Sequence, residues 1–249
     1  MIGHTTFGAN LLVVVFLLSV VDIQGEEYEV ILVPSQDNTL YLGGDEALSN
    51  GGGPNFFVGK TKSLGLRRGL LQFDVTTIPF DAEIRSVELI LNMDRSRSGE
   101  YTVGLHKVTN SWGESSSTAV KGGGLGGDAQ VGDATWKYRF YPEELWDNEG
   151  GDFDVEPTAS LPVDRVGEYR WDDEKMVEDV NTWIDDAATN HGWLLLGDES
   201  ASFSAKRFVS SNSEDIAKIP TLIIRYELAN ELPTLTQSRR WSDIKLLKD

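Results

Sequence analysis

The stretch IRSVELILNM, residues 84–93, decides the fold class of this 249-residue chain. Val87, Leu89 and Leu91 alternate with other residues, as in a β-strand that has one face in the core and the other partly covered. Seven further short runs of the same character are separated by Gly, Asn, Asp and Pro: 28–33, 56–59, 69–75, 101–108, 193–197, 206–210 and 221–227. Many short strands with turn residues between them predict an all-β protein, an antiparallel β-sandwich of jelly-roll type.

One segment has a helical period instead, and it predicts a single peripheral α-helix over residues 173–187. Its apolar stripe consists of Met176, Val177, Val180, Trp183 and Ile184. Asp172 or Asp173 can cap the start of this helix, and Asp179 falls outside the stripe. We therefore expect Trp183 to be a core residue.

The two ends of the chain differ from its centre. Residues 11–21 (LLVVVFLLSVV) have the length of a signal-peptide apolar region and are too short to span a bilayer. We expect residues 1–25 to be a signal peptide, residues 26–230 to form one β-sandwich domain, and residues 231–249 to be a flexible tail or docking segment. The protein is then secreted, with no membrane span after cleavage; an uncleaved membrane anchor is the alternative. The chain has no cysteine, so it has neither disulfides nor thiolate metal sites.

The formal net charge of −18 argues against nucleic acid as a partner, because phosphates require a basic surface. Some of the carboxylates could instead hold structural Ca²⁺, which prefers oxygen ligands. The candidate ligands each stand beside a glycine or an asparagine: Asp37, Asp45, Asp128 and Asp133. The alternative is that these carboxylates are solvated turn residues, since Asp and Gly are common in turns.

Few residues in the sequence suit catalysis. Beyond residue 25 the only histidines are His106 and His191, and there is no Gly-x-Ser-x-Gly or His-Glu-x-x-His motif. His106 with Tyr101 or Lys107 is the one local cluster that could serve a polysaccharide lyase. We therefore expect that the protein is not an enzyme.

A set of motifs extends over nearly the whole of residues 35–228. It includes 37–41 (DNTLY), 50–53 (NGGG), 58–61 (VGKT), 67–74 (RRGLLQFD), 105–108 (LHKV), 111–114 (SWGE), 132–136 (GDATW), 150–153 (GGDF), 190–197 (NHGWLLLG) and 206–208 (KRF). Together these motifs resemble the DNRLRE-domain proteins, which are secreted bacterial and archaeal β-sandwich modules. The resemblance implies a jelly-roll-like sandwich associated with the cell surface or matrix, and some members of the group are carbohydrate-binding modules. Such proteins often end in a PEP-CTERM sorting signal, whereas no apolar span follows residues 231–233 (ELP) here.

Exposed aromatic rings are the usual platforms on which proteins bind sugars. The candidate platform lies in a Gly- and Asp-rich region and comprises Trp136, Tyr138, Tyr141 and Trp146. These residues predict a non-catalytic binding module for extracellular polysaccharide or cell-surface matrix. One alternative is that these rings merely cover the sandwich. Others are a structural or adhesive matrix protein without a small ligand and, less favoured, a jelly-roll polysaccharide lyase.

Overall fold

The computed structural model describes residues 26–228 except 44–46, 63–64, 98 and 121, so the expected signal peptide, the expected tail and Asp45 lie outside the described residues. The strands are β1 (Glu27–Leu32), β2 (Pro34–Tyr41), β3 (Leu48–Ser49), β4 (Asn55–Lys60), β5 (Leu66–Phe73), β6 (Ala82–Ser96), β7 (Tyr101–Lys107), β8 (Gly127–Asp128), β9 (Tyr138–Phe140), β10 (Glu144–Leu145), β11 (Ala159–Val163), β12 (Gly167–Asp172), β13 (Trp193–Leu196), β14 (Lys206–Val209) and β15 (Thr221–Leu228). The helices are α1 (Glu174–Asp185) and the short 3₁₀ helix η1 (Ala187–Thr189).

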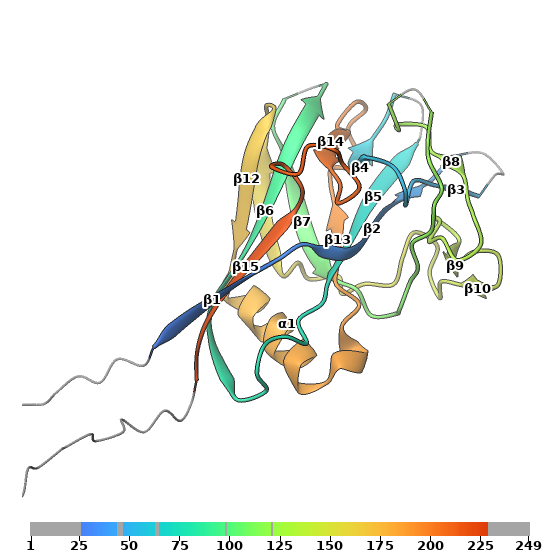
Figure 1. Cartoon of the computed structure of the whole chain (residues 1–249). Helices are drawn as coiled ribbons and strands as arrows, with labels where there is room; N and C mark the ends of the chain where they lie inside the picture. The colour runs from blue at the N-terminus through green and yellow to red at the C-terminus, as the bar shows by residue number, and fades with distance from the viewer. Residues whose placement is uncertain (1–25, 44–46, 63–64, 98, 121, 229–249) are drawn as a thin grey trace, which may run out of the picture.

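All strand pairs among the described residues are antiparallel, and they form two layers (Figure 1). In the first layer β1, β15 and β6 lie side by side, and the long β6 also pairs with β12 and β14. In the second layer the order is β2, β5, β13, β7 and β11. The predicted fold class is therefore confirmed: the protein is an all-β antiparallel sandwich with one α-helix.

Strand β4 joins the two layers into one curled sheet. Its first residues pair with β14, whereas Gly59 and Lys60 pair with β5. Gly59 has φ of +94°, and an added Cβ would lie 3.1 Å from the carbonyl of Ser204. Only glycine fits this conformation readily, so Gly59 lets the strand pass from one layer to the other.

The main core fills the space between the layers, and a second core covers the outer face of β2, β5 and β13. Alternation along β13 shows the division: Trp193 and Leu195 face the main core, and Leu194 faces the outer core. The irregular segment 109–158 supplies Trp112 and other residues that close the outer core. Figure 1 shows this segment, with β8 to β10, on the side of the molecule away from β12.

Helix α1 closes one end of the main core (Figure 1). Asp173 caps it by accepting the backbone N–H of Lys175, and Trp183 is fully buried with its ring 4.6 Å from that of Trp193, so both predictions are confirmed. The placing of Asp179 outside the buried face is wrong, because its carboxylate accepts hydrogen bonds from Thr158 Oγ1 at 2.7 Å and Trp193 Nε1 at 2.8 Å. A buried polar group that is paired in this way can lie among apolar side chains.

Candidate functional site

Three of the four predicted platform residues line one cavity. Trp136, Tyr138 and Tyr141 border a pocket of about 400 Å³, which we call the aromatic pocket. Its remaining walls are Tyr41, Leu42, Gly43, Ala47, Leu48, Thr135, Lys137 and Glu149. The pocket thus joins the irregular segment 109–158 to the end of β2.

Local hydrogen bonds hold the two tyrosines in place. Thr135 Oγ1 accepts the backbone N–H of Tyr138 at 2.9 Å, and Tyr141 donates its N–H to the carbonyl of Asp133 at 2.9 Å. The rings of Tyr138 and Tyr141 meet edge to face, with centroids 5.4 Å apart. Both rings are partly exposed, so a ligand can reach them.

A cation packs over the ring of Trp136. The guanidinium of Arg68 lies 4.7 Å from the centre of the Trp136 ring and forms an ion pair with Glu199, with Nε to Oε1 at 2.8 Å. Trp136 is half-buried because it also packs against the outer core. Lys137 and Glu149 are exposed at the same pocket and add one charge of each sign.

Trp146 does not line the aromatic pocket. It is 5 % exposed in the outer core, and its indole Nε1 donates to the carbonyl of Thr135 at 2.9 Å. The segment 109–158 folds back over apolar residues such as Leu70 and Leu194, and Trp146 covers them. A ring enclosed in this way has no free face for a sugar, so Trp146 is left out of the candidate site.

Two of the predicted metal ligands lie beside a carboxylate that the sequence analysis did not single out. Glu114 Oε2 accepts the backbone N–H of Asp37 at 2.8 Å, and the charge of Asp133 repels that of Glu114. Desolvation by burial raises the pKa of Asp37 to about 6. Burial, with repulsion from Asp37, raises the pKa of Glu114 to about 7. These three residues form what we call the carboxylate cluster.

The oxygens of the carboxylate cluster already accept hydrogen bonds. Asp37 Oδ2 accepts the N–H of Ser211 at 2.6 Å, and Asp133 accepts the N–H groups of Ser115 and Gln130 at 2.8 and 2.7 Å. Asp133 therefore ties two turns together.

A third predicted metal ligand, Asp128, is not brought into this cluster, because it is exposed in β8, opposite Leu48. The fourth, Asp45, lies outside the described residues, so its prediction is not tested. Within the described residues, no group of three or more His, Asp or Glu side chains is arranged to hold a metal ion. The calcium prediction therefore stays a prediction.

The residues considered for catalysis do not come together. His106 and Tyr101 lie on β7 at an odd spacing, so their side chains point to opposite faces. His106 Nδ1 is hydrogen-bonded to the carbonyl of Asp154 at 2.9 Å, and Lys107 forms an ion pair with Asp179 at 3.3 Å. These side chains already have partners within the fold, and the lyase cluster is not assembled.

None of the helices in the described part of the chain is long and apolar enough to cross a membrane. A scan against models of protein families finds no match for this chain, and a search of the curated proteins finds no significantly similar sequence.

Proposed function

We propose that this protein is a secreted, non-catalytic binding protein for extracellular polysaccharide, and that the aromatic pocket is its binding site. The observation that carries the proposal is that Trp136, Tyr138 and Tyr141 line one cavity together with polar groups. Sugar-binding sites combine aromatic faces, against which ring C–H groups pack, with a few polar groups that bond the hydroxyls.

The pocket offers both kinds of contact. The rings of Tyr138 and Tyr141 are perpendicular, at 85°, so one can support a sugar face while the other borders its edge. Lys137 can donate to a hydroxyl, Glu149 can accept from one, and each tyrosine hydroxyl can do either. A volume of about 400 Å³ suits one or two sugar rings rather than a longer chain.

Titration of the protein with soluble β-glucan, xylan, mannan and galactan, with and without chelator, tests the proposal. We expect saturable binding of at least one polysaccharide, weakened about tenfold or more in the Tyr138→Ala and Tyr141→Ala variants, since aromatic anchors dominate binding energy. Phe80→Ala is the matched control, because Phe80 is 85 % exposed and is not part of the pocket. Pectate is included in the panel as an acidic polysaccharide. If no polysaccharide of the panel binds saturably, the proposal fails and a structural matrix role is favoured.

A further inference from the structure

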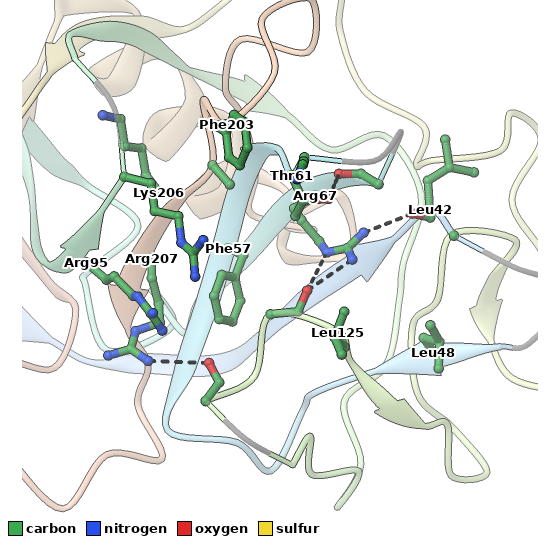
Figure 2. A pocket seen from close by; sticks show the side chains of 17 residues that line it. Leu42, Leu48, Phe57, Thr61, Arg67, Arg95, Leu125, Phe203, Lys206 and Arg207 are labelled. Atoms are coloured by element: carbon green, nitrogen blue, oxygen red, sulfur yellow. Dashed lines mark hydrogen bonds between the residues drawn. The ribbon is translucent and has the colours of Figure 1, made fainter.

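A second cavity of about 530 Å³ adjoins the aromatic pocket, and the two share Leu42, Gly43 and Leu48 as walls (Figure 2). Six of the 17 residues that line it are cationic, and none is acidic. We call this cavity the basic cleft and define it by these cations: Lys62, Arg67, Arg95, Arg97, Lys206 and Arg207. The fold thus brings six of the chain's 22 Lys and Arg residues to one cavity of a protein whose net charge is −18.

Three of these cations are held by the fold. Arg67 donates to the carbonyls of Leu42 and Gly124, as Figure 2 shows. Arg207 forms a bidentate pair with Asp94, at 2.7 and 2.9 Å. Lys206 donates to the hydroxyl of Ser96 and to the carbonyl of Gly99. Asp94 balances the charge of Arg207, and Lys206 interacts electrostatically with Asp164.

The other three cations have no such partner. Lys62, Arg95 and Arg97 are exposed and form no hydrogen bond or ion pair with any residue that the structure describes. Arg95 lies directly across from Arg207 in the β6–β14 pair. Because Asp94 already balances the charge of Arg207, the exposed cations at this end of the cleft that have no carboxylate partner among the described residues are Arg95 and Arg97.

The two arginines also approach the same point of the backbone. A Cβ built on Gly122 would lie 3.7 Å from Nη1 of Arg95 and 3.6 Å from Nη1 of Arg207. Arg97 follows Arg95 by two residues and lies directly after the end of β6. A guanidinium presents a planar set of N–H donors that suits carboxylate and sulfate groups, so this end of the cleft is built for an oxyanion.

The basic cleft also has apolar side chains in its walls. Leu125 is 72 % exposed and Phe203 is 37 % exposed, and both line the cavity together with the buried Phe57. Phe203 has φ of +68°, a conformation that L-residues rarely adopt and that often marks a functional position. Figure 2 shows Phe57 between Arg67 and Arg207 in this view. Apolar side chains and cations therefore line the same cavity.

We infer that the basic cleft binds an acidic sugar residue. Arg95 and Arg97 hold its carboxylate or sulfate ester, and the sugar ring packs on Phe203 and Leu125. This inference rests on the proposed function and deepens it, because the polysaccharide that spans the aromatic pocket and the basic cleft is then anionic. The wall that the two cavities share places the two sites within reach of one chain.

Nucleic acid would need a basic surface that extends along many phosphates. The six cations of the basic cleft line one cavity of about 530 Å³ on an acidic protein. A cavity of this size fits one or two charged groups of a ligand rather than a run of phosphates.

Calorimetric titration with three matched tetrasaccharides tests the inference: tetragalacturonate, its neutral methyl ester, and a sulfated tetrasaccharide. A single-stranded tetranucleotide is the fourth ligand. We expect the unesterified or the sulfated tetrasaccharide to bind about tenfold or more tightly than the methyl ester, and added salt to weaken this preference, as for charge-assisted contacts. The tighter of these two ligands shows whether the basic cleft prefers a sugar carboxylate or a sugar sulfate ester.

The Arg95→Gln/Arg97→Gln variant should lose the preference and still fold, since neither side chain has a partner among the described residues. Arg165→Gln/Lys175→Gln removes the same charge from exposed positions outside the cleft and should keep the preference. Equal binding of the acid and the ester overturns the inference, as does tighter binding of the tetranucleotide.

The Tyr138→Ala variant separates the two proposals. The proposed function stands and the inference falls if Tyr138→Ala abolishes the binding of neutral polysaccharide and the wild-type protein binds the acidic tetrasaccharide no more tightly than its methyl ester. If only the arginine variant has an effect, the basic cleft stands and the aromatic pocket falls.

Discussion

The carboxylate cluster predicts that the fold becomes less stable as the pH rises toward neutrality. Burial raises the pKa of Asp37 from 3.8 to about 6, so the folded protein binds this proton more tightly than the unfolded chain does. Between these two values the folded state carries more protons, and the free energy of unfolding must fall with rising pH. The stabilisation is complete below about pH 4 and is lost as the pH rises through the folded-state pKa.

A rise of about two pKa units corresponds to about 3 kcal/mol, at about 1.4 kcal/mol per unit. Glu114, with its pKa raised to about 7, acts in the same direction and extends the window upward. The contribution of Glu114 to the free energy of unfolding is smaller than its raised pKa alone would give, because solvent screens this partly exposed group. We therefore expect the free energy of unfolding to fall by about 3 kcal/mol between about pH 4 and pH 7 through Asp37.

Urea denaturation followed by tryptophan fluorescence at several pH values measures this dependence. Asp37→Asn resembles the protonated side chain, so this variant should lose most of the slope. Asp74→Asn is the control: hydrogen bonds from Thr76 lower the pKa of Asp74, so its contribution is lost only below about pH 4. If the wild-type protein and the Asp37→Asn variant keep the same slope, Asp37 is ionised in the folded protein and the reasoning is refuted.

Four further predictions follow from the core and from the sequence. Trp183→Ala should destabilise the fold by about 3–5 kcal/mol in the same urea assay, and a loss below about 1 kcal/mol would contradict its burial. Asp179→Ala leaves the indole N–H of Trp193 without its acceptor, so we expect a loss of about 1–3 kcal/mol, which Asp179→Asn should partly restore. If calcium binds the folded protein, the free energy of unfolding should be about 2.7 kcal/mol higher in calcium at a hundredfold excess over the Kd than in chelator. Identical midpoints of thermal melts in calcium and in chelator would exclude calcium binding. Mass spectrometry of the secreted protein should find an N-terminus near Glu26, and an intact Met1 would contradict the signal peptide.

The tertiary structure decided which polar residues are buried. Strand β2 was not predicted, because its PSQDNT sequence is that of a turn. The fold buries Asn38 in this strand, where its Oδ1 accepts from Thr39, Ser49 and Asn50. Residues distant in sequence supply two of these donors, so the strand's environment could not be inferred from its own residues.

The candidate sites also differ in how much of each could be predicted from the sequence. The sequence singled out Trp136, Tyr138 and Tyr141 because they lie close together along the chain, and the structure brings them to one pocket. Arg67 and Arg95 line the basic cleft from different strands, and their spacing in the sequence does not indicate that they share one cavity.

The sequence by itself revealed eight strands and the helix from the period of their side chains, although it missed β12, where Tyr169 and Trp171 alternate with charged residues. All eight predicted strands and the helix are present, and Val87, Leu89 and Leu91 lie in the main core as their alternation indicates. The period of a strand or helix is a local property, so neighbouring residues reveal it. Which loops meet, which carboxylates are buried, and where unpaired cations gather depend on contacts between distant segments, and only the tertiary structure decided them.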